Sequence, residues 1–312
     1  MTDNYVRKTL PLRFSLGEFC LFSVDLSLLV STDYFLDCDA ERGPNVTTEM
    51  LGDEVQGMLF RSYPVEQQLS RLSFMNRMIR YTPNYYRRFY VILEGTFDEY
   101  LAKFSSKSRS TLRRKVRKFA DFSGGSIDFR ACRSPEEIRD FFEPAHQVSA
   151  KTYQEKLLGM GLPDSSAFME EAVQMASSDG ARGFLLFHDQ RPISYLYCPI
   201  REGVLFYQYL GYDPAYASWS PGTVLQHLVL EQVYAESKLR LFDFTEGEGR
   251  HKEFFSTGNT QCADIYYLKR TMWNLTIVTT HYGLSVLTKM IVQTLKVLRL
   301  KKLIKRFVRR SA

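Results

Sequence analysis

Charged residues follow one short apolar run in the last third of the chain. Leu239–Phe244 has the composition of a short strand that ends with Asp243 near its edge, and Glu246 and the basic run Arg250–Lys252 come directly after it. Loops beyond the ends of strands in open α/β sheets are common ligand sites, where a carboxylate can accept a proton and a cation can bind an anion. Asp243 and Glu246 are therefore candidate general bases. A solvated loop of mixed charge is the alternative.

A second candidate site precedes these acids. Ser220, Pro221, Gly222 and Thr223 form a helix-start signal, because Pro fits the first helical turn and Gly lets a ligand approach the backbone. The unpaired N–H groups and partial positive charge of such a terminus suit a phosphate. An ordinary capped helix is the alternative.

The positive charge of the chain is concentrated in two segments. The net charge is +6, from 41 Lys and Arg against 35 Asp and Glu. Residues 103–118 contain eight Lys or Arg and no acid, and residues 289–310 contain nine and no acid. We interpret Phe97–Phe122 as one long helix with an apolar stripe and a basic face that includes Arg109 and Arg113. The basic face indicates either a solvated surface or an anionic partner.

Regular elements surround the candidate site. Three successive strands are predicted at Arg182–His188, Pro192–Ile200 and Val204–Leu210, with short polar turns between them. Ser134-Pro135 with two following acids predicts a helix start, and Asp164–Ser178 an amphipathic helix. The stretch from His146 through Lys151 to Tyr153 is polar and could line a cleft, although His146 could equally be a structural imidazole. A closing hairpin is expected near Ala263–Arg270.

The first 95 residues carry weaker signals. Phe14–Leu29 and Arg88–Leu93 look like strands, whereas Pro64–Arg80 has apolar residues at helical spacing. Met1–Leu12 lacks the apolar core of a signal peptide, and we find no stretch with the roughly 18 apolar residues of a membrane span. We therefore expect a cytoplasmic protein.

The C-terminal segment 284–312 predicts a basic amphipathic helix. Apolar residues share one helical face between Leu300 and Val308, and Lys and Arg share the other. This pattern suits an anionic membrane surface at the inner face of the membrane. Packing against a partner subunit and a frayed tail are the alternatives.

Metal and disulfide chemistry are not expected. The five cysteines are far apart and contain no Cys-x-x-Cys pair, and the five histidines lack ligand spacing on one helix.

Three segments together resemble the GNAT-type acyltransferases of the CelD/BcsL kind, associated with cellulose and exopolysaccharide production and related to FemAB-like transferases. The segments are Phe97–Ala102 with the basic run to Lys118, Gly211-Tyr212-Asp213-Pro214 through Thr223, and Phe242–Phe244 through Lys252. The resemblance covers most of residues 88–270.

The resemblance implies an α/β (α+β) fold with tandem GNAT-like domains, built from mixed, mostly antiparallel sheets flanked by helices, plus the C-terminal basic helix. We expect a degenerate N-terminal GNAT-like domain at 1–95, a linking helix at 96–125, the C-terminal GNAT domain at 126–272 and the basic tail at 273–312. In that fold the pantetheine arm of coenzyme A lies between two diverging strands, here Val204–Leu210 and Leu239–Phe244.

The implied function is transfer of an acyl group, in the first instance acetyl, from acyl-CoA to a hydroxyl or amine of a glycan, glycolipid or related envelope precursor, without a metal. The alternatives are a FemAB-like aminoacyl-tRNA-dependent transferase that docks tRNA on the basic helix, and a non-catalytic accessory protein at the membrane. The residues expected in the site are, for catalysis, Glu246, Asp243, Tyr207 and Tyr209; for the cofactor, Ser220, Gly222, Thr223 and Lys252; and for the substrate, His146, Lys151, Tyr153, Gln208, Arg109 and Arg113.

Overall fold

The computed structural model describes residues 5–297, except 18, 42, 45, 47–49, 53, 76, 153–160 and 237. The chain forms two compact units, which are described separately. Unit 1 comprises residues 1–88 and 260–311, and unit 2 comprises residues 89–259. The helices at 97–122 therefore lie in unit 2, and the chain beyond residue 260 returns to unit 1.

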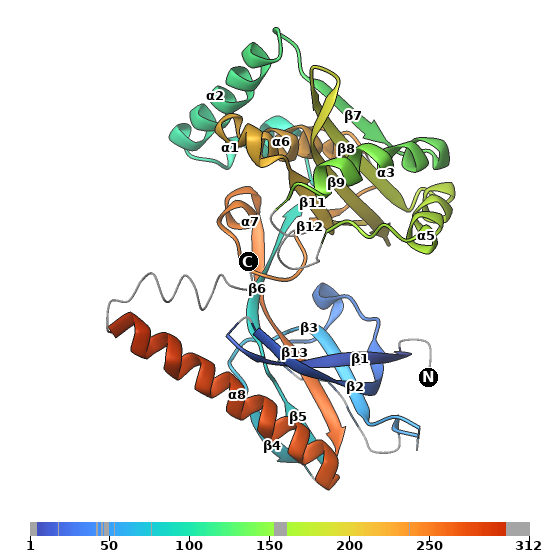
Figure 1. Ribbon diagram of the computed structural model, residues 1–312, viewed down its shortest axis with the longest axis vertical. Coiled ribbons are helices and arrows are strands. Elements are labelled where there is room, and N and C mark those ends of the chain that lie inside the picture. The colour runs from blue at the N-terminus through green and yellow to red at the C-terminus, as the bar shows by residue number, and fades with distance from the viewer. Residues whose placement is uncertain are drawn as a thin grey trace. The chain divides into compact units, whose positions relative to one another are not determined.

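Unit 1 is a mostly antiparallel sheet covered by one long helix (Figure 1). Its strands are β1 (Tyr5–Leu16), β2 (Phe19–Ser31), β3 (Gly57–Pro64), β4 (Leu72–Met75), β5 (Met78–Tyr81) and β13 (Gly258–Lys269). They pair in the order β1-β2-β3-β13-β5-β4, and only the β2–β3 pair is parallel. The short 3-10 helix η1 (Phe35–Asp37) follows β2.

The helix α8 (Met272–Val297) packs against this sheet. Its buried residues Ile277 and Val278 share a core with Leu12, Phe14 and Leu268 from the strands. By length and composition the described part, Met272–Leu295, is apolar enough to cross a membrane, which corrects our reading that no stretch reaches that length. The basic amphipathic pattern between Leu300 and Val308 lies outside the described residues.

Two further expectations in unit 1 are wrong. Pro64–Arg80 forms no helix, because its apolar residues are used in the β4–β5 hairpin, where Ile79 pairs with Leu268 of β13. The predicted hairpin at Ala263–Arg270 is one continuous strand, β13, which pairs with β3 and β5. In both places long-range strand pairing overrides local spacing.

Unit 2 is a mixed sheet with helices on both faces. The antiparallel strands β7 (Asp128–Cys132), β8 (Ala181–His188) and β9 (Arg191–Arg201) pair in chain order. Next to β9 lie β10 (Val204–Phe206) and β11 (Tyr209–Tyr212). The strand β12 (Leu241–Asp243) pairs parallel with β10 and antiparallel with the end of β6 (Tyr85–Ile92). The meander at residues 182–210 is thus confirmed, with β10 and β11 in place of one strand.

The two faces of the sheet build separate cores. On one face α1 (Phe97–Ala102), α2 (Ser106–Phe122) and α6 (Pro221–Tyr234) pack on Phe184, Leu186 and Leu196. On the other face α3 (Pro135–Ser149) and α5 (Ser166–Ser177) pack on Leu185, Phe187 and Tyr195. Successive residues of one strand point to opposite faces. Burial on both faces explains the unbroken apolar run Phe184–Phe187 in β8.

The helix boundaries follow capping chemistry. The Ser134 side chain accepts a hydrogen bond from the Glu137 N–H and the Glu137 carboxylate accepts one from the Ser134 N–H, so the predicted start of α3 is confirmed. The single helix predicted at Phe97–Phe122 is wrong. It is two helices, α1 and α2, because Ser105 caps a new N-terminus by accepting from the Ser108 N–H.

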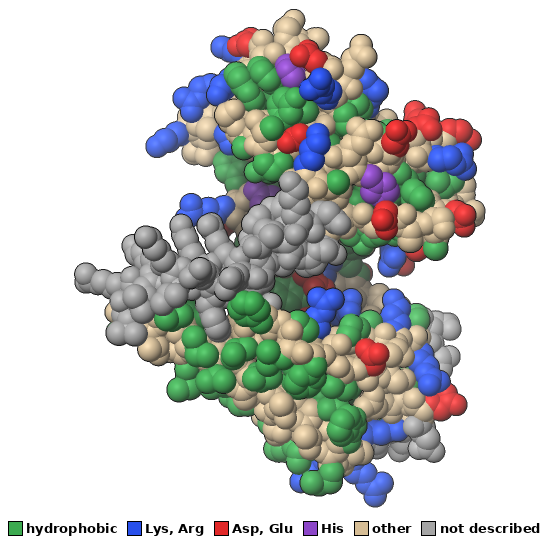
Figure 2. All heavy atoms as spheres, in the orientation of Figure 1, with side chains coloured by type: hydrophobic (Ala, Val, Ile, Leu, Met, Phe, Trp, Pro, Cys, Tyr) green, Lys and Arg blue, Asp and Glu red, His purple; other side chains and the backbone are tan. Residues whose placement is uncertain are grey.

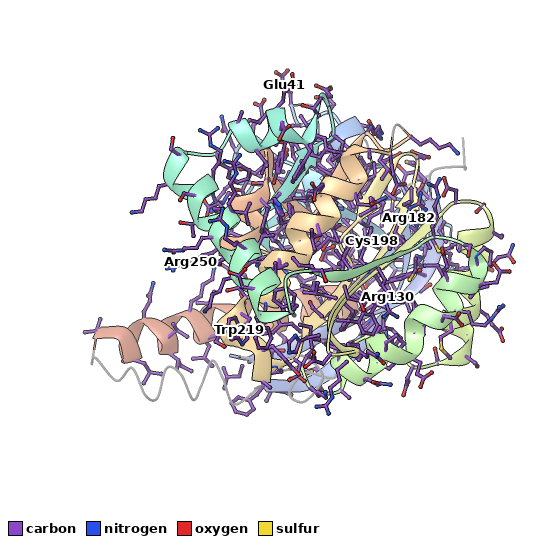
Figure 3. All side chains as sticks on the ribbon, turned by 90° about the horizontal axis from the view of Figure 1, so that it is seen from above. Glu41, Arg130, Arg182, Cys198, Trp219 and Arg250 are labelled. Atoms are coloured by element: carbon purple, nitrogen blue, oxygen red, sulfur yellow. The ribbon has the colours of Figure 1, made fainter. Side chains whose placement is uncertain are left out.

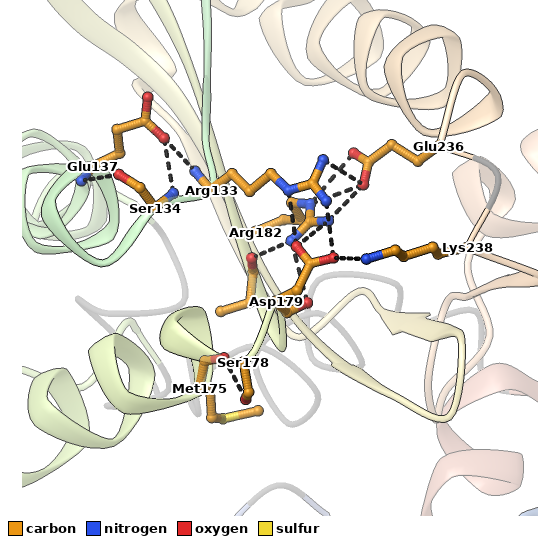
Figure 4. Close-up of polar contacts among 10 residues, drawn as sticks. Arg133, Ser134, Glu137, Met175, Ser178, Asp179, Arg182, Glu236 and Lys238 are labelled. Atoms are coloured by element: carbon orange, nitrogen blue, oxygen red, sulfur yellow. Dashed lines mark hydrogen bonds and ion pairs between the residues drawn. The ribbon is translucent and has the colours of Figure 1, made fainter.

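An ion-pair network holds the C-terminal end of α6 (Figure 4). The guanidinium of Arg182, only 2% exposed, lies 2.6 Å from the carboxylate of Glu236, which follows α6, and 2.9 Å from that of Asp179. Arg133 binds Asp179 at 2.8 Å. Burial alone would raise the pKa of Asp179, but the two guanidiniums outweigh it and lower the pKa. The network therefore holds the C-terminal end of α6, and the N-terminal end of the same helix lines a pocket.

Candidate active site

The site lies where two neighbouring strands of unit 2 separate. β10 and β12 pair over three residues, from Val204–Leu241 to Phe206–Asp243, and the Tyr207 N–H then donates to the Asp243 carbonyl. Beyond this point β11 pairs only with β9 among the described strands. The strands therefore form a fork that opens after Tyr207.

A β-bulge accounts for the separation. On β9, Tyr197 and Ile200 are three positions apart in the sequence. Their partners on the neighbouring strand, Tyr209 and Leu205, are four positions apart, so that strand contains one extra residue. The extra residue bends the strand away from β12 and changes which face the following side chains occupy. Tyr207 consequently lies in the core beneath α6, and Tyr209 packs against the opposite core beside Phe168 and Tyr197.

A pocket of about 480 Å³ lies in the fork. Its walls come from the forked strand, the 3-10 helix η3 (Pro214–Trp219), the start of α6 and the short helix α7 (Arg250–Phe255). Apolar side chains and a few polar groups line it, which is the usual composition of a small-molecule site. The lining residues used below are Tyr207, Ser220, Gly222, Thr223, Gln226 and His251.

The N-terminus of α6 forms one wall of the pocket. Ser220 precedes it in the left-handed region, with φ of 56°, and its side chain makes no capping bond. Pro221 has no N–H to offer, and the Thr223 N–H already donates to the Ser220 carbonyl at 2.9 Å, so Gly222 contributes the first backbone donor that faces the pocket. The 14-residue helix directs its dipole at this wall. This geometry suits an anionic group.

One buried side chain in the wall lacks hydrogen-bond partners within the part of the chain that the structure describes. Gln226 is 3% exposed, lies one turn into α6, and neither its amide nitrogen nor its amide oxygen is bonded to another described residue. Unpaired buried amides are costly, so they call for a specific explanation. A ligand in the pocket would supply both a donor and an acceptor to Gln226.

Two lysines from α2 reach the same end of α6. The Lys115 ammonium lies 3.4 Å from the Thr223 hydroxyl, and the Lys118 ammonium donates to the Ser218 carbonyl at 3.2 Å. Lys118 also lies 4.5 Å from the centre of the Trp219 ring, which stacks on Phe122 of α2 (Figure 3). The basic helix thus adds two cations beside the N-terminus of α6.

Two titratable groups, Tyr207 and His251, line the pocket. Burial raises the pKa of the Tyr207 phenol, so that it keeps its proton at neutral pH. Burial and the neighbouring Lys252 ammonium lower the pKa of His251, so that its imidazole is neutral there. The two ring centres are 6.0 Å apart. A proton donor and a proton acceptor therefore stand in one pocket.

The structure brings together only some of the residues expected from the sequence. Tyr207, Ser220, Gly222 and Thr223 line the pocket, whereas the other described candidates do not. The Asp243 carboxylate is fully buried and accepts the Thr245 N–H at 2.7 Å.

Two further candidates, Glu246 after β12 and Gln208 between β10 and β11, have exposed side chains. Glu246 is exposed, and its carbonyl accepts from the Lys252 ammonium at 2.6 Å. Gln208 is exposed, and its N–H donates to the Tyr197 carbonyl.

The candidates on helices mostly make contacts within the fold. The His146 imidazole bonds the Pro163 carbonyl at 2.9 Å, and Lys151 forms a 2.9 Å ion pair with Asp213 in the turn before η3. Arg109 contacts the Ser106 hydroxyl, and Arg113 is exposed on α2. Tyr153 lies outside the described residues.

Sequence reasoning missed four contributors: Lys115 and Lys118 as a specific pair, Gln226 and His251. The eight-cation run was the one signal that pointed to the lysines. Gln226 carried none, and His251 was noted only within the run Arg250–Lys252, because the position of both in one pocket depends on the packing of α6 and α7. Within the described residues no group of three or more His, Cys, Asp or Glu side chains could hold a metal ion.

Comparison with known proteins agrees with this architecture. Residues 106–253, from α2 to α7, match the family model described as "Acetyltransferase (GNAT) domain". The predicted GNAT-like fold is therefore confirmed for this segment, and the finer assignment to the CelD/BcsL kind stays a prediction. A search of curated proteins by sequence found no match.

Solved structures with similar folds are distant. FemX is 9% identical, with 85% of this chain and 88% of FemX covered and a TM-score of 0.49. The structure named L-PGS from Bacillus licheniformis is 15% identical, with 72% of each chain covered and a TM-score of 0.42. Likenesses this distant carry no information about substrate.

Proposed function

We propose that the protein is an acyl-CoA-dependent acyltransferase whose donor binds in the fork between β10–β11 and β12. The observation that carries the proposal is the pocket itself. It combines a helix terminus without a side-chain cap and the amide of Gln226, which no described residue pairs, and two lysines from α2 lie beside it. The diphosphate of coenzyme A would be bound by the Gly222 N–H at the start of α6, and Lys115 and Lys118 would balance its charge.

The pocket also supports a direct transfer. The hydroxyl or amine of the acceptor would attack the thioester carbon while a base removes its proton, and the C–S bond would break as the new C–O or C–N bond is completed. Tyr207 would give its proton to the leaving thiolate. His251 is the base that the pocket favours, since it is neutral and lines the wall; Glu246 and Asp243 remain the alternatives proposed from the sequence.

The acceptor follows from the resemblance stated above. We propose a hydroxyl or amine of a glycan, glycolipid or related envelope precursor, and acetyl as the first acyl group to test.

A thermal-shift experiment tests the donor. CoA, acetyl-CoA and tRNA are added in parallel to the full chain, and we expect CoA and acetyl-CoA to raise Tm, since a ligand at a hundred times its Kd stabilises by about 2.7 kcal/mol. Lys115→Met with Lys118→Met should reduce the shift, whereas Lys107→Met, an exposed change at the other end of α2, should not. Absence of any CoA shift in the unmodified protein would exclude the donor.

One observation favours a second function. Arg113, Arg114 and Arg117 are exposed on α2 and could dock RNA, as an aminoacyl-tRNA-dependent transferase requires. That reading predicts tRNA binding that weakens steeply as salt rises. A tRNA shift without a CoA shift would replace the first proposal with this one.

A further inference from the structure

The outward face of α8 in unit 1 is almost free of charge. Between Thr271 and Leu295 the only charged residue is Lys289. Large apolar side chains on this face are exposed, and they are Met272, Trp273, Val286, Leu287 and Met290. The helix rises about 39 Å over its 26 residues. A helix face turned to water normally carries charged residues, so this face has the composition of a covered one (Figure 2).

The inward face of α8 is bound to the protein. Asn274 is 2% exposed, donates to the Lys269 carbonyl and accepts from the Gln56 amide. His281 bonds the Arg13 carbonyl through Nε2 and the Tyr81 hydroxyl through Nδ1. A helix that crossed a bilayer would have to give up these contacts. α8 can therefore meet an apolar medium only along its outward side.

The start of β2 extends the same apolar surface. Phe19, Leu21 and Phe22 are between 41% and 54% exposed. The Gly17 N–H, in the turn before β2, donates to the Thr288 hydroxyl of α8 at 3.1 Å. That bond holds the turn that leads into β2 beside α8.

The charge of the chain beyond α8 identifies what covers this surface. Residues 298–312 contain seven Lys and Arg and no acid. Their charge would attract an anionic surface, because each cation near the lipid headgroups strengthens binding to the membrane. A second copy of this chain would offer the same acid-free sequence after α8, and therefore no anionic counterpart there for these cations.

We propose that the outward face of α8 and the Phe19–Phe22 segment dock unit 1 onto the surface of an anionic phospholipid bilayer. The helix lies parallel to the membrane plane, with its apolar side chains at the headgroup boundary, and the seven cations in the sequence after α8 favour an anionic bilayer. This docking goes beyond the proposed transfer reaction and does not depend on it.

Trp273 offers a direct probe. It is 60% exposed on α8, whereas Trp219, the other tryptophan of the chain, stacks on Phe122 in unit 2. The full-length protein is mixed with vesicles of phosphatidylcholine alone or with 30% phosphatidylglycerol. We expect a blue shift of tryptophan emission and co-sedimentation with the anionic vesicles. Trp273→Phe should lose the shift, and Trp219→Phe should keep it.

A charge-insertion pair tests the surface. Leu287→Glu with Met290→Glu should weaken partition into anionic vesicles by about thirtyfold, from the charge added at the headgroups. The control adds the same two charges at exposed positions of α5, by Ala167→Glu with Gln174→Glu, and should leave partition unchanged.

Three outcomes overturn the docking proposal. The first is that the unmodified protein does not bind vesicles. The second is vesicle binding that the double substitution Leu287→Glu with Met290→Glu leaves unchanged. The third is a stable dimer that this double substitution dissociates while vesicles remain unbound. The CoA-induced Tm shift of the Leu287→Glu, Met290→Glu variant should equal that of the unmodified protein. Failure of the docking proposal and failure of the transferase proposal are therefore distinguishable.

Discussion

Replacing Gln226 by leucine should stabilise the protein and weaken its ligand affinity. In the ligand-free protein both polar atoms of the Gln226 amide are buried without a described partner. Leaving a buried polar group unpaired costs about 1–3 kcal/mol, and an apolar side chain of similar size avoids that cost. We therefore expect Gln226→Leu to raise the unfolding free energy by about 2 kcal/mol, which corresponds to about 4–8 °C in Tm for a unit of this size.

The same substitution removes two hydrogen bonds to the bound ligand. At about 1 kcal/mol each, their loss should weaken CoA binding about thirtyfold. Differential scanning fluorimetry with and without CoA measures both effects in one experiment. Gln232→Leu, an exposed change on the same helix, is the matched control and should alter neither quantity. A fall in ligand-free Tm together with an unchanged CoA shift would refute the reasoning, because Gln226 would then have a purely structural role.

Three further predictions concern the ion-pair network and the two titratable groups. Glu236→Gln removes one partner of the buried Arg182 and should lower the unfolding free energy by about 3 kcal/mol in urea titrations. Asp128→Asn, which breaks an exposed pair, should cost less than about 1 kcal/mol, and equal costs would contradict this account. Tyr207→Phe should lower kcat about a hundredfold while the CoA-induced shift persists; unchanged turnover would remove Tyr207 as the acid. Because the pKa of His251 is lowered from 6.5, its neutral form persists below that pH, so kcat/KM should fall only at lower pH. His251→Asn should abolish that acid limb, and a limb that survives would point to a carboxylate base.

Local signals predicted the elements that local chemistry determines. The capping residues of α3 and the turns between β8, β9 and β10 are readable because each depends on a few neighbouring residues. The fold class was also predictable, since three separated segments carried one family resemblance and residues 106–253 match that family's domain.

The positions of the site residues depended on features without a local signal. Tyr207 and Tyr209 are two residues apart and would share a face in a regular strand, so the sequence treated them as equivalent candidates. The bulge between β10 and β11 places them in opposite cores. Likewise, Leu72 and Ile79 satisfied a helical spacing that pairing with β13 overrode.

A crystal structure of the protein with CoA tests the central claim most directly. We predict the pantetheine arm between β11 and β12, with the diphosphate against the Gly222 N–H at the start of α6 and the amide of Gln226 bonded to the ligand. Coenzyme A bound elsewhere, with the fork filled by protein side chains, would contradict the account.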